Sequence, residues 1–212
     1  MPVRLSRRGL VVPAAALWGL FAGLTAVVAV WPGFFLDTMV DGLIARLRSS
    51  VEPALPGVRG AAGLVARLGA REVLVPLALV AGTVLSWRRR SLVPLALVVG
   101  SYLLVAGVAS FTKAGLARPQ PLPLPGVPGR AFPSGHAAQA VVVFGALAML
   151  AGGGRRAFAL AAGVVGAVCV ALLWRQAHWL TDMVGGVVLG AACLATVDAA
   201  LRRERSPVAS HR

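Results

Sequence analysis

The sequence is poor in charged residues, and especially in negative ones. Only 13% of its 212 residues are charged, and seven acidic residues stand against 21 basic ones, of which Lys113 is the single lysine. So few charges beside 58% hydrophobic residues exclude an intrinsically disordered chain and exceed the apolar share of an ordinary soluble domain. The composition therefore predicts a single integral membrane domain over residues 1–212.

Cysteine and histidine are also scarce. Cys169 and Cys193 fall inside apolar runs, where we expect small core residues rather than a disulfide or a metal pair. The chain offers no cluster of carboxylates, so we expect no metal site and no cofactor. Of the three histidines, His211 lies in the C-terminal tail, which leaves His136 and His178 as candidates for chemistry.

The excess of positive charge has two interpretations. A net charge of +14 is common in proteins that bind nucleic acid. Here, however, the basic residues form short groups between long apolar runs, as they do in the loops of membrane proteins. We therefore expect membrane lipids as partners, and no nucleic acid.

Six apolar runs approach the length of about 20 residues that a bilayer requires. They cover residues 9–31, 73–87, 92–111, 136–150, 158–174 and 183–201. The first run is longer than the hydrophobic region of most signal peptides, which favours a retained helix over a cleaved one. Prolines crowd segment 113–135 and exclude a regular helix there, so this segment is predicted to be a connector.

Segment 32–71 has a different pattern. Apolar residues recur at helical spacing from Leu36 to Leu47, with charged residues on the other face. This pattern predicts a short amphipathic helix in the membrane interface or, alternatively, a surface helix packed on the bundle. The predicted fold is all-α: a six-transmembrane-helix bundle with a short amphipathic interfacial helix between the first and second spans.

Arginine groups predict the orientation of the bundle. The groups at 88–90 and 155–156 and the arginines near both termini fall at alternate ends of the spans. The positive-inside rule places these ends in the cytoplasm, with both termini. The connector and the turn at 175–182 then lie on the outer side of the cell membrane.

Two segments on this outer side carry the candidate catalytic residues. Ser134 can cap the helix that follows, and the amides of Gly135 and His136 are then unpaired first-turn donors that suit an anion. His178 and Asp182 share one helix face, where the carboxylate can fix the tautomer of the imidazole. An ordinary helix cap and a structural His–Asp pair are the alternatives.

Cations without acidic neighbours accompany these segments. No acidic residue lies between Glu72 and Asp182. Uncompensated cations beside a helix N-terminus favour a multiply charged anion, although a basic face for anionic lipid headgroups is the alternative. The cations of this stretch on the predicted outer side are Lys113, Arg118, Arg130 and Arg175.

Together these segments resemble the type 2 phosphatidic acid phosphatase (PAP2) superfamily of membrane lipid phosphatases, over residues 72–201. The family motifs are Lys-x6-Arg-Pro, Pro-Ser-Gly-His and Ser-Arg-x5-His-x3-Asp. The resemblance implies that His178 attacks phosphorus with Asp182 orienting it, and that His136 protonates the leaving oxygen and then activates water. It also implies that the phosphoryl oxygens contact Lys113, Ser134 and Gly135.

The sequence departs from the family at two arginines. The arginine of the first motif falls on Gln120, and that of the third motif falls on Leu172. Arg118 and Arg175 are the expected substitutes, and Gln120 can donate one neutral hydrogen bond. Substrate binding is therefore assigned to these three residues as well.

The activity implied by the resemblance is metal-independent hydrolysis of a lipid phosphate or diphosphate through a phosphohistidine intermediate. A polyprenyl phosphate or diphosphate is favoured over phosphatidic acid or phosphatidylglycerol phosphate. The departures at the two arginines support an alternative, a catalytically impaired member that binds or translocates lipid phosphates. A vanadate-dependent haloperoxidase shares the motifs, but such enzymes are soluble, which disfavours this interpretation.

Overall fold

The computed structural model describes residues 8–122 and 129–204, in which the regular structure is entirely helical. This confirms the predicted all-α fold. The helices are α1 (Arg8–Val30), α2 (Phe35–Ala54), α3 (Val58–Arg67), α4 (Arg71–Arg89), α5 (Val93–Leu116), α6 (Gly135–Leu150), α7 (Arg155–Trp174) and α8 (Leu180–Glu204).

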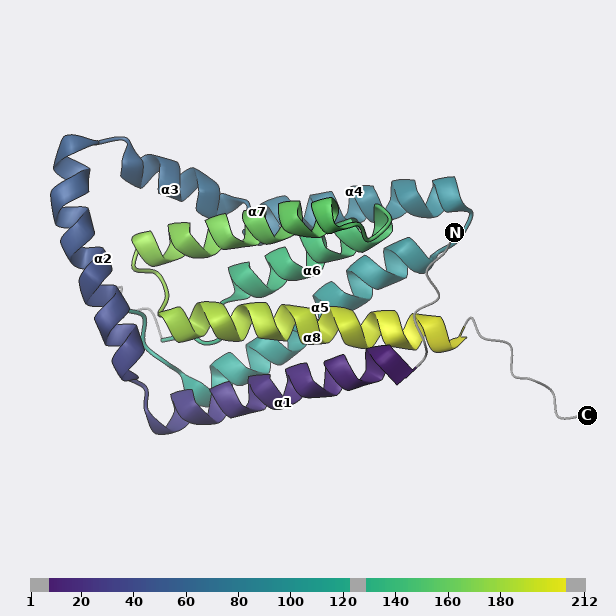
Figure 1. Cartoon of the computed structure of the whole chain (residues 1–212), viewed down its shortest axis with the longest axis horizontal. Coiled ribbons are helices and arrows are strands. Elements are labelled where there is room, and N and C mark those ends of the chain that lie inside the picture. The colour runs from purple at the N-terminus through teal and green to yellow at the C-terminus, as the bar shows by residue number, and fades with distance from the viewer. Residues whose placement is uncertain (1–7, 123–128, 205–212) are drawn as a thin grey trace, which may run out of the picture.

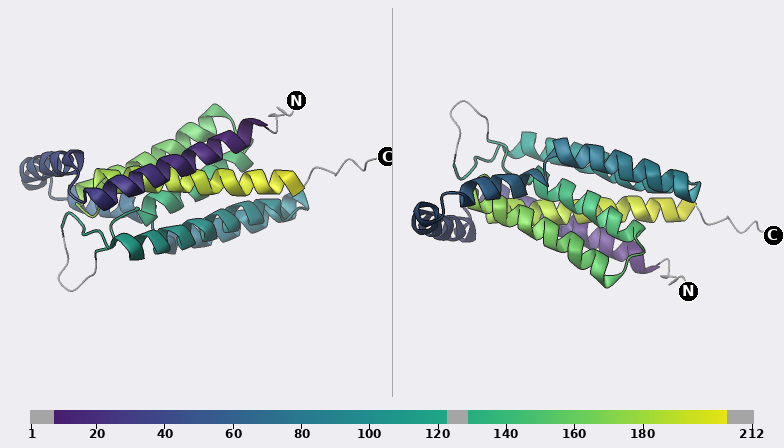
Figure 2. Two further views of the ribbon diagram at one scale, coloured as in Figure 1. Left: turned by 90° about the horizontal axis from the view of Figure 1, so that it is seen from below. Right: turned by 90° about the horizontal axis from the view of Figure 1, so that it is seen from above.

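The bundle helices, which lie along one common direction, are α1, α4, α5, α6, α7 and α8. Helix α2 crosses one end of this bundle (Figure 1). Helix α8 packs against α1, α5 and α6, and α6 also packs against α7. Successive long helices run in opposite directions, so that α1 begins and α8 ends away from α2 (Figures 1 and 2). The end of α5, the start of α6, the end of α7 and the start of α8 therefore all lie at the end of the bundle that α2 crosses.

By length and apolar composition, four stretches of the described residues can span a membrane: Val58–Arg89, α5, α7 and α8. Residues Ala14–Val30 of α1 pass the same test together with α2, as a pair bent by 79°, and α6, with 16 residues, is shorter than a full span. These results support a membrane protein, whereas the count of six spans stays a prediction.

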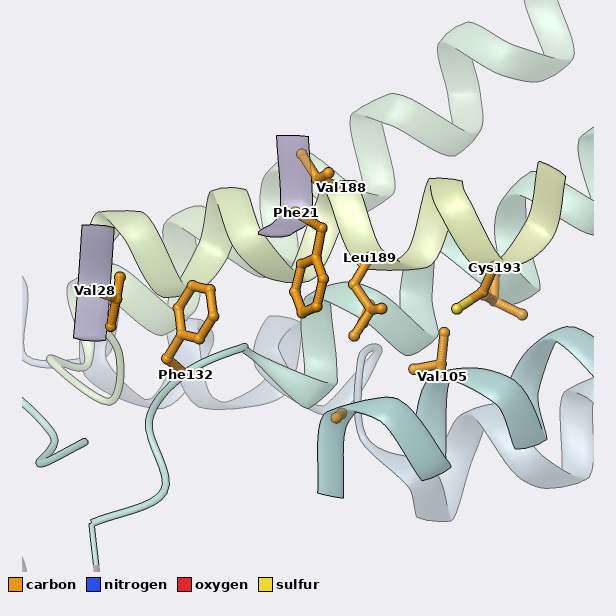
Figure 3. Packing of buried hydrophobic residues seen from close by; sticks show 10 residues of the cluster. Phe21, Val28, Val105, Phe132, Val188, Leu189 and Cys193 are labelled. Atoms are coloured by element: carbon orange, nitrogen blue, oxygen red, sulfur yellow. The ribbon is translucent and has the colours of Figure 1, made fainter. Parts of the chain in front are cut away.

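A hydrophobic cluster fixes the segment that leads into α6. Phe132 is fully buried and stacks on Phe21 of α1, with ring centroids 6.1 Å apart. Leu189 and Cys193 of α8 and Val105 of α5 belong to the same cluster (Figure 3). Phe132, two residues before Ser134, is thus held in a hydrophobic cluster to which α1, α5 and α8 contribute.

Glycines let α8 approach α6 closely at this end. A Cβ atom added at Gly186 would lie 2.5 Å from the carbonyl oxygen of Ser134, and one at Gly190 would lie 2.5 Å from that of Ala138. Any larger residue would force the helices apart. The backbone amide of Ser134 donates to the carbonyl oxygen of Asp182 at 3.0 Å, so the starts of α6 and α8 are joined directly.

Segment 32–71 forms two helices where one was predicted. The break between α2 and α3 contains Pro56 and Gly57, which disfavour helix and were available as a signal in the sequence. Helix α3 packs against α7. The sequence pattern therefore predicts α2 as a helix but does not predict α3, and a position in the membrane interface stays a prediction.

Helix α2 turns its polar side toward the protein. Gln176, in the turn after α7, donates through Nε2 to Asp41 at 2.9 Å and accepts from Arg48 at 2.6 Å. A hydrogen bond from Arg48 holds the pKa of Glu52 below its ordinary value. The opposite side of α2 is apolar and exposed, and carries Phe35, Leu36, Met39, Leu43 and Leu47.

Candidate active site

The imidazole of His178 faces the carboxylate of Asp182. His178 lies in the turn before α8, and Asp182 lies in the first turn of α8. The distance from Nδ1 of His178 to Oδ2 of Asp182 is 3.5 Å, and Asp182 is fully buried. The same Oδ2 accepts the backbone N–H of Trp179 at 2.8 Å. With Nδ1 turned toward a carboxylate, Nε2 is the nitrogen available for attack.

The start of α6 lies at the same end of the bundle. The Ser134 hydroxyl accepts the backbone N–H of Ala137 at 3.4 Å, which confirms the predicted helix cap. A Cβ atom added at Gly135 would meet nothing within 4 Å, so the first turn of α6 borders open space. An anion placed there would meet unpaired backbone donors at the positive end of the helix.

His136 is the second residue of α6 and is partly buried. It lies within electrostatic reach of His178, Lys113 and Glu72. The turn between α3 and α4 packs against His136, because a Cβ atom added at Gly69 would lie 3.2 Å from the Cβ atom of His136. The structure thus brings the two predicted catalytic histidines to one end of the bundle.

Lys113 lies in the last turn of α5, and not in the connector as predicted, because α5 continues to Leu116. The lysine Nζ donates to the carbonyl oxygen of Arg130, which ties the end of α5 to the chain before α6. Lys113 is partly buried and within electrostatic reach of Asp182. Its side chain keeps further donor capacity for a phosphoryl oxygen. Residues 123–128 of the connector lie outside the described residues.

Arg118 is fully engaged by the protein. Its side chain is 1% exposed, and its five N–H donors match five hydrogen bonds. The guanidinium donates to Oδ2 of Asp37 and Oδ1 of Asp182, each at 2.6 Å, to the hydroxyl of Thr181 at 2.7 Å, and twice to the carbonyl oxygen of Pro32. The structure therefore does not present Arg118 to a phosphoryl group, and its predicted contact with substrate is replaced by a structural bridge.

Arg175 and Gln120 are in more open positions. Arg175 is exposed, and its Nη1 lies 3.0 Å from where a Cβ atom at Gly63 of α3 would be. Gln120 is partly buried in a stretch attached to the turn before α8: Trp179 donates through Nε1 to the carbonyl oxygen of Pro119 at 2.9 Å. The predicted contacts of both residues with substrate stay predictions.

Sequence reasoning missed Asp37 and Thr181. Asp37 accepts the backbone N–H of Thr181 at 2.8 Å and its hydroxyl at 2.6 Å, in addition to the bond from Arg118. The helical spacing of segment 32–71 predicts only that Asp37 lies on the charged face of that helix. The one signal available was the rarity of acidic residues, which makes each of the seven a candidate for a specific partner.

The arrangement can support transfer of a phosphoryl group. The imidazole of His178 with the carboxylate of Asp182 beside it, the imidazole of His136 and the amine of Lys113 lie near the open start of α6. Nucleophile, acid–base group and anion donors are the parts that hydrolysis of a phosphate ester through a covalent intermediate requires.

Comparison with known proteins gives a family and a fold. The family model of the PAP2 superfamily matches residues 91–205. A transmembrane PAP2-type phosphatidylglycerolphosphate phosphatase from Bacillus subtilis superposes with a TM-score of 0.73 at 20% identity, over 92% of this chain and 98% of that one. LpxE from Aquifex aeolicus gives 0.64 at 20% identity, over 78% and 96%. No curated protein matches the sequence.

Proposed function

Because the chain belongs to the PAP2 superfamily, we propose that it is a membrane phosphatase that hydrolyses a lipid phosphate or diphosphate at the outer face of the cell membrane. The observation that carries this proposal is the approach of His178 to Asp182, at 3.5 Å, at the end of the bundle where α6 begins. The Bacillus subtilis neighbour, a phosphatidylglycerolphosphate phosphatase, has the same fold.

The proposed reaction has two steps. Nε2 of His178 attacks phosphorus, the bond from phosphorus to the lipid oxygen breaks, and His136 protonates that oxygen. His136 then accepts a proton from water, the water oxygen attacks phosphorus, and the P–N bond breaks to release phosphate and neutral His178. Lys113 and the α6 amides stabilise the phosphoryl charge in both steps. No step requires a metal ion.

The proposed setting is a bundle of six spans with both termini in the cytoplasm. The exposed apolar side of α2 lies in the outer interface of the membrane, where its leucines contact lipid. The charged side of α2 bonds to the bundle, through Asp41 and Gln176 among others. A substrate whose tail stays in the bilayer can then reach His178 with its headgroup. Polyprenyl phosphates and diphosphates are the favoured substrates, ahead of phosphatidic acid and phosphatidylglycerol phosphate.

One observation favours a second candidate, a catalytically impaired member that binds or translocates lipid phosphates. All five donors of Arg118 are used within the protein, and the two family arginine positions hold Gln120 and Leu172. Of the positively charged residues assigned to the substrate, Lys113 and Arg175 then remain to stabilise the phosphoryl charge.

Phosphate release from mixed micelles separates the two candidates. The purified full chain is assayed with polyprenyl diphosphate, polyprenyl phosphate, phosphatidic acid and phosphatidylglycerol phosphate, with a chelator present. We expect release from at least one lipid, and a loss of at least about 1,000-fold in His178→Ala, as for other covalent nucleophiles. Equal release by both proteins would exclude the enzyme, and binding without release would favour the second candidate.

A further inference from the structure

A buried chain of contacts connects α2 to the nucleophile. Asp37 in the first turn of α2 and Asp182 in the first turn of α8 each accept a bond of 2.6 Å from the guanidinium of Arg118. The other oxygen of Asp182 faces Nδ1 of His178 at 3.5 Å. Three side chains therefore link a helix outside the bundle core to the group proposed to attack phosphorus.

One cation shared by two carboxylates leaves a net negative charge. The side chains of Arg118, Asp37 and Asp182 are at most 1% exposed, so water screens their interactions little. With Asp37 present, the guanidinium of Arg118 pairs with two carboxylates. The negative charge of Asp182 is then only partly compensated, and the remainder can stabilise a positive charge on the imidazole of His178. Without Asp37, Arg118 would neutralise Asp182, and the carboxylate would stabilise a positively charged or phosphorylated His178 less.

Asp37 also fixes the position of Asp182 through the backbone. One oxygen of Asp37 accepts the N–H of Thr181, and the other accepts the Thr181 hydroxyl. Thr181 immediately precedes Asp182, so these bonds set where the first turn of α8 begins. A displacement of this turn would move the Asp182 carboxylate away from His178, and a shift of about 1 Å in a catalytic group can lower a rate about 100-fold.

From these contacts, and resting on the proposed phosphatase function, we propose that Asp37 is a positioning residue for the nucleophile. It acts through Arg118 and Thr181, so that Arg118 compensates the charge of Asp182 only in part and the Asp182 carboxylate stays directed toward His178. Asp37 touches neither the substrate nor the reacting nitrogen, and its effect is exerted on the rate of the chemical step rather than on the binding of the lipid.

The chain supplies a matched control on the same face of α2. Asp41 lies one turn further along the helix and also attaches α2 to the bundle, through the amide of Gln176 at 2.9 Å. No hydrogen bond or ion pair joins Asp41 to Arg118 or Asp182 among the described residues. If Asp37 only anchors α2 to the bundle, replacing Asp37 or Asp41 by asparagine should change kcat by the same factor.

The test compares Asp37→Asn, Asp37→Glu and Asp41→Asn with the wild type in mixed micelles, measuring kcat, KM and the thermal unfolding midpoint. We expect Asp37→Asn to lower kcat about 10- to 100-fold, the range for residues that orient a reacting group, with KM changed less than about twofold. Asp37→Glu, which restores the carboxylate, should recover part of kcat. Asp41→Asn should keep kcat within about twofold of the wild type.

Two results would overturn the proposal while leaving the phosphatase intact: kcat unchanged in Asp37→Asn, or an equal loss of kcat in Asp41→Asn. If Asp37→Asn does not fold, Asp37→Ser decides, because serine also removes the carboxylate, and an unchanged kcat in that folded variant overturns the proposal too. A wild type that releases phosphate from no lipid refutes the proposed function, and with it this inference.

Discussion

Replacing Gly135 by alanine separates a substrate site from an ordinary helix start. Apart from its chain neighbours and the backbone of its own helix turn, the added Cβ atom would meet no atom within 4 Å, so the fold accommodates it. Alanine favours helix over glycine by up to about 1 kcal/mol. The variant is therefore expected to unfold at the same temperature as the wild type, or slightly above it.

The expected effect on activity has the opposite sign. The methyl group would occupy the open space at the start of α6, where we place the phosphoryl oxygens, and would separate one of them from the backbone donors. A hydrogen bond to a charged group contributes about 1.5–3 kcal/mol. Since about 1.4 kcal/mol corresponds to a factor of ten, kcat/KM should fall roughly 10- to 100-fold.

The assay is phosphate release by the purified variant, with thermal unfolding in the same detergent. The matched control is Gly163→Ala on α7, where an added Cβ atom also meets nothing within 4 Å, and where activity should not change. Wild-type kcat/KM in Gly135→Ala would refute the placement of the phosphoryl group at α6. A loss of thermal stability would refute the structural premise.

Two further changes test the packing and the setting of the site. Gly186→Ala should lower the free energy of unfolding by about 1–3 kcal/mol, because its Cβ atom would lie 2.5 Å from the carbonyl oxygen of Ser134; unchanged thermal unfolding in detergent would contradict the close approach of α8 to α6. A second test attaches a nitroxide to Leu43→Cys, with both native cysteines replaced, in protein reconstituted into vesicles. Because that side of α2 is exposed and apolar, we expect the nitroxide to collide more often with oxygen than with a water-soluble nickel complex. More frequent collisions with the nickel complex would place α2 in water.

Much of the fold follows from local features of the sequence. Long apolar runs between arginine groups predict the positions of the six long helices to within a few residues, because the pattern depends only on neighbours along the chain. The cap at Ser134 is equally local. Pro56 and Gly57, which separate α2 from α3, are an equally local signal.

The partners of Arg118 could not be predicted in the same way. Its ion pair with Asp37 joins residues 81 apart in sequence, and no periodicity connects them. Arg118 was the expected substitute for the family arginine missing at Gln120, whereas the fold buries it between two carboxylates, where a charge must be paired. Motif spacing identifies which residues reach one end of the bundle, but tertiary packing decides what each side chain binds there.

A structure with orthovanadate, which adopts the geometry of the phosphoryl group in the transition state, tests the central claim most directly. We predict vanadium bonded to Nε2 of His178, with His136 within about 3 Å of the opposite apical oxygen and the amides of α6 donating to the equatorial oxygens. Vanadate bound away from His178, or His136 too distant to touch it, would contradict the account.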